Sequence, residues 1–285
     1  MERIAVMTDT NSGISPEDAQ QLGIFLLAMP FSVDGRTYHE FLDLSHEEFY
    51  ARQLAGAQFS SSQPAPADLL DMWDKALEDH DKLIYIPMTS ALSGSCSTAQ
   101  GFAGDYDGRV LVVDNRRISV PLKQSVQEAV RLRDAGMDAR AIVDRLTQKA
   151  LESHIYISAE DLQYLKRGGR ITPAVAAVGT MLNIKPVMKI MGGKLDMYRK
   201  VRGMKQARQT MLDAIQADLD STFAGKEVII AAAYSGDRQE GEAWAQVVHE
   251  AFPQYPFMSD PLPLSVGCHV GPGALGAAIL TDFDH

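Results

Sequence analysis

The stretch KLIYIPMTSALSGSCSTAQ, residues 82–100, contains two patterns that decide the fold. Its first part, KLIYIPM, is a short and almost continuously apolar run, which is typical of a strand buried on both faces of a parallel sheet. The run RVLVVDN at 109–115 repeats this pattern, and apolar residues with helical spacing mark 66–79 and 125–136. Strands that alternate with helices predict a parallel sheet with helices on both faces.

The N-terminal segment begins the same alternation. Residues 3–8 form an apolar run that predicts a strand. Ser15 is a suitable N-cap for a following helix, and Pro16 suits the first helical position.

The pattern changes near residue 150. Residues 184–201 predict a hairpin with Gly192 and Gly193 at its turn. The elements expected after it are a helix over about 204–221, a strand over 226–236 and a helix containing Trp244.

These patterns predict a two-domain α/β fold. We expect an N-terminal parallel-sheet α/β domain over 1–153 and a C-terminal α/β domain over 154–285.

The composition excludes several classes of protein. The 27 Lys and Arg residues are outnumbered by 37 Asp and Glu residues, giving a formal net charge of −10. Such a chain lacks the basic face that a general nucleic-acid binder needs. No apolar stretch has the length of a signal peptide or a membrane span, and the two cysteines make no disulfide framework. The chain is predicted to be cytoplasmic and not to bind nucleic acid.

Motifs for metal-dependent or nucleotide-dependent catalysis are absent from the sequence. There is no HExxH pair, no GxxxxGK[ST] loop and no GxSxG elbow. We therefore expect no metal site and no resident cofactor.

Small polar residues gather in three clusters, at 59–66, 88–100 and 264–276. Ligands of parallel-sheet proteins bind beyond the carboxyl ends of the strands, where the second cluster lies. In SGS, Gly94 permits close backbone approach, and the amides of a following helix suit an anion. The third cluster, LSVGCHVGPGALG, places His269 before a glycine-proline-glycine turn, and we expect a short apolar helix to begin near Pro272. The alternative is that these residues only make turns and caps.

The same segments, taken together, resemble the DegV family. The resemblance rests on MTDTNSGIS, SSSQPAP, SALSGSCSTAQ, VVDNRRIS, LQYLKRGGRIT, GTMLNIKPVMKI, KVRGMKQA and GCHVGPGALG, in this order over the whole chain. It implies a two-domain α/β fold that buries a long-chain fatty acid between or within the domains. It also implies a non-enzymatic carrier that presents the fatty acid to a bacterial fatty acid kinase. The kinase makes an acyl phosphate, which the carrier takes to phospholipid synthesis.

The resemblance also implies residue roles. The carboxylate is expected to contact Ser61, with Ser62 beside it, and also Ser93 and His269. The bound fatty acid is then the only ligand, and transient contact with a membrane or an acyltransferase is compatible with this role. From the residues themselves, the tail lining is expected in the predicted helix 172–183, with Val175, Val178 and Met181, and in the run 274–280.

Basic residues on this acidic chain predict a protein-facing edge. Arg170 and Arg202 are the candidates for contact with the kinase or with a phosphate, against the alternative of a solvated surface.

Two other functions stay open from the sequence. One is an acyl hydrolase in which Ser93 or Cys96 is the nucleophile and His269 the base. The other is a module that binds a different small carboxylate.

Overall fold

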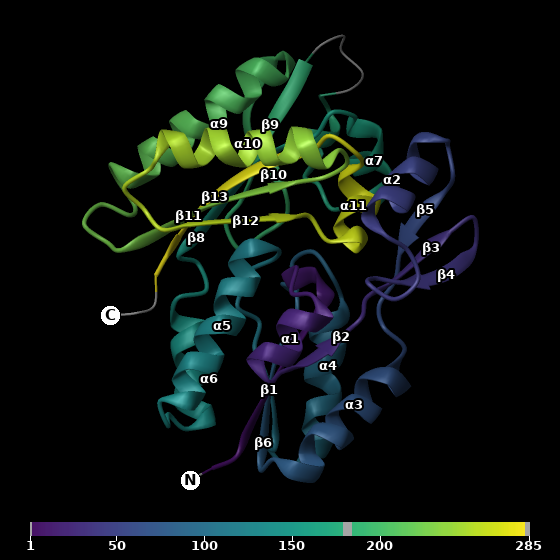
Figure 1. Ribbon diagram of the computed structural model, residues 1–285, viewed down its shortest axis with the longest axis vertical. Helices are drawn as coiled ribbons and strands as arrows, with labels where there is room; N and C mark the ends of the chain where they lie inside the picture. The colour runs from purple at the N-terminus through teal and green to yellow at the C-terminus, as the bar shows by residue number, and fades with distance from the viewer. Residues whose placement is uncertain (1, 179–183, 283–285) are drawn as a thin grey trace.

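The computed structural model describes residues 2–178 and 184–282. Its strands form three sheets, and Figure 1 shows the largest of them lying across the end of the parallel sheet.

The N-terminal part contains the predicted parallel sheet. Its strand order is β2–β1–β6–β7, and all three pairings are parallel. The strands are β2 (Phe25–Leu27), β1 (Ile4–Asp9), β6 (Lys82–Ile86) and β7 (Val110–Val112). From β1 the chain continues to β2 at one edge of the sheet, and from β6 it continues to β7 at the other edge. Because these two connections leave in opposite directions, the carboxyl ends of β1 and β6 flank a crevice.

Helices cover both faces of this sheet because alternate residues of a strand point to opposite faces. Ile4 and Val6 of β1 pack with the helices α1, α5 and α6, whereas Ala5 and Met7 pack with α3 and α4. The helices are α1 (Pro16–Leu22), α3 (Pro66–Asp79), α4 (Ser95–Ala103), α5 (Val120–Asp134) and α6 (Ala139–Gln148). Short 3-10 turns are formed by Thr10–Ser12 (η1) and Gly104–Tyr106 (η2). Ser15 caps α1 as predicted, since its hydroxyl accepts a 3.0 Å hydrogen bond from the backbone of Asp18.

A small antiparallel sheet, which the sequence did not predict, projects from the N-terminal part. Its order is β4–β3–β5, and its strands are β4 (Arg36–His39), β3 (Pro30–Val33) and β5 (Phe59–Ser61). With α2 (His46–Leu54) it packs against α11 (Leu264–Val270) from the far end of the chain. Figure 1 shows β3, β5, α2 and α11 side by side.

The C-terminal part contains a six-stranded mixed sheet in the order β10–β9–β8–β13–β11–β12. The strands are β8 (Ser153–Ser158), β9 (Ile184–Ile190), β10 (Asp196–Arg202), β11 (Val228–Tyr234), β12 (Phe257–Pro261) and β13 (Leu275–Thr281). The hairpin predicted over 184–201 is therefore confirmed as β9 and β10, which pair antiparallel.

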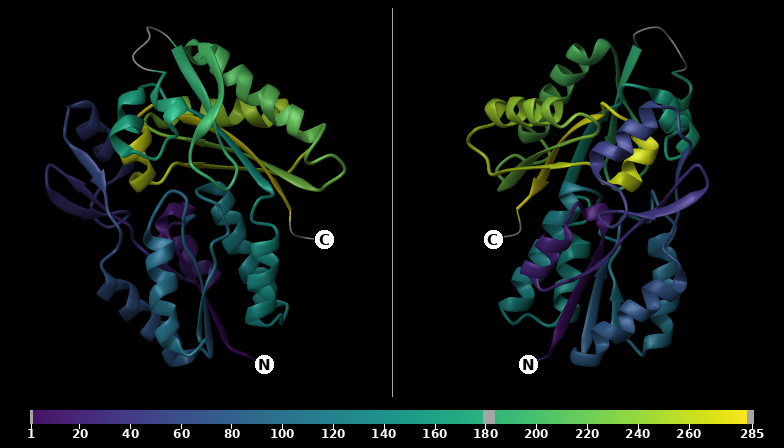
Figure 2. Two further views of the ribbon diagram at one scale, coloured as in Figure 1. Left: turned by 180° about the vertical axis from the view of Figure 1, so that it is seen from behind. Right: turned by 45° about the vertical axis from the view of Figure 1, so that its right-hand side comes forward.

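Two long helices cover the face of this sheet that points away from the parallel sheet. They are α9 (Gly203–Leu219) and α10 (Arg238–Ala251), and both views in Figure 2 show them on that side. The short helices α7 (Leu162–Gly168) and α8 (Pro173–Ala176) lie between β8 and β9 in the chain. Of the predicted helix 172–183, residues 172–178 are described, and they are helical only over α8. Residues 179–183, with Met181, lie outside the described residues.

The prediction of a helix after the glycine-proline-glycine turn was wrong. The helix is α11, which precedes the turn and ends at Val270, and the run after the turn is the strand β13. A short run of small apolar residues fits either element, and here β13 is held on both sides by pairing with β8 and β11. His269 thus lies in the last turn of α11, and Pro272 begins no helix. Gly271 ends α11 with a φ of 71°, a conformation that glycine adopts readily.

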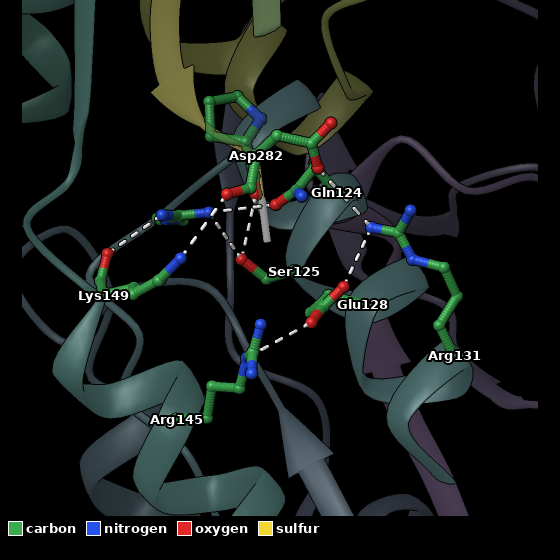
Figure 3. Close-up of polar contacts among 9 residues, drawn as sticks. Gln124, Ser125, Glu128, Arg131, Arg145, Lys149 and Asp282 are labelled. Carbon is green, nitrogen blue, oxygen red and sulfur yellow. Dashed lines mark hydrogen bonds and ion pairs between the residues drawn. The ribbon is translucent and has the colours of Figure 1, made fainter. Parts of the chain in front are cut away.

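A buried arginine joins the segment after β7 to α5 and to the end of α6. Arg117 is 1% exposed, and it donates hydrogen bonds to the Ser125 hydroxyl of α5 at 3.0 Å and to the Lys149 carbonyl at 2.9 Å. Nearby, Figure 3 shows Glu128 between Arg131 and Arg145, with Asp282 beside them. Along the chain, β7 is the last strand of the parallel sheet and β8 is the first strand of the six-stranded sheet. The domain boundary at residue 153 remains a prediction, because it concerns whether the two parts fold independently.

Candidate functional site

A cavity of about 290 Å³ lies between the carboxyl ends of the parallel strands and the inner face of the six-stranded sheet. We call it the main cavity. Residues from both halves of the chain line it, among them Met88 and Leu92 after β6 and Ile155 and Ile157 in β8. The lining is mostly apolar and its polar residues gather around Ser61, Ser93 and His269, an arrangement typical of a small-molecule site.

The floor of the main cavity consists of small residues. Ala231 of β11 pairs with Ala278 of β13, and Ala233 pairs with Gly276. Directly paired residues point to the same face of a sheet, and here that face lines the cavity. Larger side chains at these positions would fill the space. Val175 and Val178, which the sequence favoured as lining, are buried nearby but do not line the cavity, whereas the run 274–280 contributes as expected.

The polar end of the main cavity contains a hydrogen bond between distant segments. Ser61, the last residue of β5, has its hydroxyl 2.7 Å from Nε2 of His269 in α11. The pairing of β5 with β3 and the packing of α11 against both strands place the two residues together. Ser62 follows β5, is exposed and also lines the cavity.

The imidazole of His269 is held in its neutral form. Burial, with a smaller contribution from the positive charge of Arg170, lowers its pKa to about 4. Its Nδ1 is buried without a hydrogen-bond partner among the described residues. The ring fits because residue 168 is glycine, where a Cβ would come within 2.4 Å of Nδ1.

Ser93 and Gly94 lie at the entrance of α4, as the sequence predicted, and both line the main cavity. The Ser93 hydroxyl lies 2.9 Å from that of Ser95 and accepts from the Ser95 backbone. Gly94 allows the amide of Gln63 to approach, because a Cβ there would lie 2.5 Å from Nε2 of Gln63.

The two candidate arginines have different environments. Arg170 lines the main cavity and is partly buried, with Nη1 bonded to the Gly168 carbonyl at 2.5 Å. Arg202 lies outside the cavity at the exposed end of β10, where the backbone enters α9. The sequence assigned both to one edge, whereas only Arg202 is on open surface.

Sequence reasoning missed the polar residues that connect β1 to α11. Asn11 lines the cavity; its amide nitrogen donates to Asp9 at 2.8 Å, and its carbonyl accepts from the Ser265 hydroxyl. Glu40 accepts from the Thr10 hydroxyl at 2.8 Å and from the Leu264 backbone at 2.5 Å. Burial raises the pKa of Asp9 to about 6 and that of Glu40 to about 8. The motif MTDTNSGIS was the available signal, but nothing in it pointed to α11.

The geometry bears on the hydrolase alternative. Among the described residues, no hydrogen bond joins Ser93 to His269, since Nε2 of the histidine contacts Ser61 and the Ser93 hydroxyl contacts Ser95. A histidine that acts as a base is normally oriented by a hydrogen bond to its second ring nitrogen. Nδ1 of His269 has no hydrogen-bond partner among the described residues. Cys96 and Cys268 are free and buried, and burial raises the pKa of each thiol to about 12.

Two further features of the described chain concern metals and membranes. Residues 2–178 and 184–282 contain no group of three or more His, Cys, Asp or Glu side chains arranged to hold a metal ion. Within the same ranges, no helix has the length and apolar character required to cross a bilayer.

Comparison with known proteins agrees with this architecture. The family model described as "Uncharacterised protein, DegV family" matches residues 3–282. A DegV domain-containing protein of Listeria innocua is 29% identical over 278 residues, which cover 96% of this chain and 97% of its own length.

Solved structures show the same fold. A DegV family protein from Thermus thermophilus, described by its fatty acid binding, superposes with a TM-score of 0.88 at 28% identity, covering 98% of this chain and 99% of its own. A stearic-acid-binding protein from Eubacterium ventriosum has a TM-score of 0.89 at 21% identity, covering 100% of this chain and 99% of its own, and supports the fold alone. The resemblance seen in the sequence is confirmed, and this chain belongs to the DegV family.

Proposed function

We propose that the protein binds a long-chain fatty acid in the main cavity and presents its carboxylate to a fatty acid kinase. The observation that carries the proposal is an apolar cavity that ends at Ser61, Ser93 and His269. The fatty acid binding described for the Thermus thermophilus relative, at 28% identity over nearly the whole chain, supports the choice of ligand.

The tail supplies most of the affinity in this proposal. Burial of one methylene yields about 0.8 kcal/mol, so a tail of about fifteen methylenes contributes on the order of 12 kcal/mol before ordering costs. The small floor residues Ala231, Ala233 and Ala278 leave the room that the tail requires.

The carboxylate end needs hydrogen-bond donors because a bare buried carboxylate is very costly. The hydroxyls of Ser61 and Ser93 and Nε2 of His269 supply neutral donors, and Arg170 supplies the nearest positive charge. Neutral donors leave the carboxylate more nucleophilic than a bidentate arginine pair does, which suits a group that must react.

The reaction itself takes place on the partner kinase. A carboxylate oxygen attacks the γ-phosphorus of the kinase-bound nucleoside triphosphate and forms a new O–P bond. The bond from that phosphorus to the β–γ bridging oxygen breaks, and the nucleoside diphosphate leaves with the electron pair. No proton is transferred. The carrier then takes the acyl phosphate to phospholipid synthesis, in transient contact with a membrane or an acyltransferase in the cytoplasm.

The first test is denaturing mass spectrometry of a solvent extract of the purified protein. We expect one fatty acid in near-stoichiometric amount, whose mass reports the preferred tail. An empty extract from a protein that also fails to take up added fatty acid would refute the binding proposal and favour a different carboxylate ligand.

Kinase docking is tested separately on the exposed basic surface at β10. Arg202→Glu should weaken binding to the kinase, because it reverses a charge on that surface. Lys75→Glu, an equal charge change on the exposed face of α3, is the matched control. Equal affinity of the two variants for the kinase would end the docking proposal.

An acyl hydrolase remains the second candidate, with a different nucleophile from the Ser93 or Cys96 expected from the sequence. Ser61 lies 2.7 Å from His269, as a nucleophile and its base do. A hydrolase would release the alcohol of an activated long-chain ester in a burst followed by turnover. A carrier would bind the ester without turnover.

A further inference from the structure

A serine hydroxyl on the wall of the main cavity has no hydrogen-bond partner in the described chain. Ser119 lines the cavity and is 6% exposed. Its Oγ is buried, and it makes no hydrogen bond with any of residues 2–178 and 184–282. Most buried side-chain polar atoms of proteins are paired, because an unpaired one loses its hydration without replacement. The hydroxyl of Ser119 is therefore a candidate contact for a ligand in the cavity.

The local backbone explains why this hydroxyl is not used by its own helix. Ser119 occupies the N-cap position of α5, where a serine hydroxyl usually accepts a hydrogen bond from the first helical turn. Its φ of 56° and ψ of −139° differ from the extended backbone of such a cap, and among the described residues the side chain makes no capping bond. A positive φ is strained for a residue other than glycine, and strain of this kind is concentrated at functional sites.

The backbone of Ser119 is nevertheless held firmly. Its amide donates to the Asn11 carbonyl at 2.8 Å, and its carbonyl accepts from the amides of Leu122 at 2.8 Å and Lys123 at 3.0 Å. The strained conformation is thus fixed by bonds to η1 and to α5. It leaves the hydroxyl available to a group in the cavity that Ser119 lines.

Ser119 belongs to the apolar part of the cavity, away from the polar end. The next residue, Val120, packs with Ala231 and Ala278 of the floor. Figure 1 shows the first turn of α5 close to β11 and β12 of the six-stranded sheet. At the polar end, Ser61 and His269 are bonded to each other. A carboxylate held there places the acyl chain, and not the head group, beside Ser119.

An unsubstituted acyl chain offers nothing to this hydroxyl. Methylenes packed over Oγ exclude water from it and leave it unpaired, which costs free energy. An oxygen atom on the chain would accept its proton in a hydrogen bond. The first turn of α5 contains no acidic residue, so the positive end of the helix dipole also favours a ligand oxygen there. A second carboxylate would need several donors, so a single serine hydroxyl suits a neutral oxygen better.

We infer that Ser119, at the start of α5, binds a hydroxyl group on the acyl chain, so that the main cavity accepts hydroxy fatty acids. This inference rests on the proposed function and names a substrate class for the same cavity. The carboxylate stays at Ser61 and His269, while the Ser119 hydroxyl donates to the oxygen on the chain. The protein therefore selects ligands by the position of that oxygen along the chain.

The first test needs only the wild-type protein. Positional isomers of a hydroxy fatty acid are compared with the unsubstituted fatty acid of equal length, by displacement of a fluorescent fatty acid. At most positions the hydroxyl should weaken binding about tenfold or more, because it is buried among apolar side chains without a partner. At the position that lies beside Ser119 this loss should disappear. An equal loss at every position would overturn the inference.

The second test is Ser119→Ala, which removes the hydroxyl and keeps the Cβ, so the backbone strain is unchanged. The matching hydroxy isomer should bind about tenfold more weakly to this variant, through the lost hydrogen bond. The unsubstituted fatty acid should bind slightly more tightly, since its tail no longer covers an unpaired hydroxyl. These opposite changes are the signature of a contact with the chain.

Ser61→Ala is the matched control because both ligands share the carboxylate. It should weaken both by the same factor, and thermal unfolding checks that each variant is folded. Equal changes for the two ligands in Ser119→Ala would show that Ser119 serves the structure alone. No change for either would show that a water molecule pairs with the hydroxyl whatever the ligand. Both results reject the inference.

Failure of this inference is distinguishable from failure of the proposed function. A wild-type protein that binds no unsubstituted fatty acid refutes the proposed function, whereas Ser119-dependent binding of one hydroxy isomer would still support the contact. Tight binding of the unsubstituted fatty acid with no positional preference among the hydroxy isomers would keep the proposed function and reject the contact.

Discussion

Filling the alanine floor of the main cavity should shorten the preferred fatty acid. Ala278 of β13 is 5% exposed, lines the cavity beside its paired residue Ala231, and packs against Val120. The Ala278→Leu substitution adds three side-chain carbons that point toward the same space. They should displace about three methylenes of the tail, since a packed interior has no spare volume.

The expected loss follows from the transfer free energy. Three methylenes at about 0.8 kcal/mol each amount to about 2.4 kcal/mol, or roughly a sixtyfold weaker affinity for the longest fatty acid that the wild type binds. A fatty acid about three methylenes shorter should bind both proteins with nearly equal affinity.

The assay is displacement of a fluorescent fatty acid by a saturated series of increasing length. Ala217→Leu, on the exposed side of α9, is the matched control, and thermal unfolding shows whether each variant keeps its fold. A loss of affinity that is equal at every chain length, or no loss of affinity at all, would refute the claim that the alanine floor limits the length of the bound tail.

Three further predictions concern the polar residues. Because burial lowers the pKa of His269 to about 4 from a usual 6.5, the unfolded chain binds this proton first as the pH falls. Stability should therefore decrease by about 2 kcal/mol between pH 7 and pH 5, and His269→Gln should remove that part of the slope in chemical denaturation; parallel slopes would contradict it. Ser61→Ala should weaken fatty acid binding about tenfold through the lost hydrogen bond to the carboxylate, with exposed Ser97→Ala as the control in the same displacement assay. Burial raises the pKa of Glu40 to about 8 from 4.5, so the folded state holds this proton and stability should fall as the pH rises through that window. Glu40→Gln should flatten this fall, and an unchanged profile would show that Glu40 is ionised at neutral pH.

Features that depend on neighbouring residues were predictable. The apolar runs of β1, β6 and β7, the Ser15 cap and the β9–β10 hairpin all match the expected elements. Strand runs, caps and turns are set by residues a few positions apart, so their signal is present in any short window. The three polar clusters also marked three of the segments that line the main cavity.

The error at the glycine-proline-glycine turn shows the limit of local patterns. The run 274–280 is apolar and rich in small residues, and such a run is compatible with a buried helix or a buried strand. Pairing with β8, more than a hundred residues earlier, and with β11 made it a central strand. No local propensity encodes that pairing.

The sequence by itself determined the alternation of strands and helices, the family, and the segments that carry polar ligand-binding residues. Only the tertiary structure decided how these residues combine: that Ser61 bonds His269 across 208 positions, that Arg170 faces the cavity rather than the open surface, and that Ser119 lies on the wall of the same cavity. The physical reason is that such contacts arise when the small sheet packs on α11 and the two large sheets meet. Packing of this kind depends on the shapes of surfaces assembled from the whole chain, which no short stretch specifies.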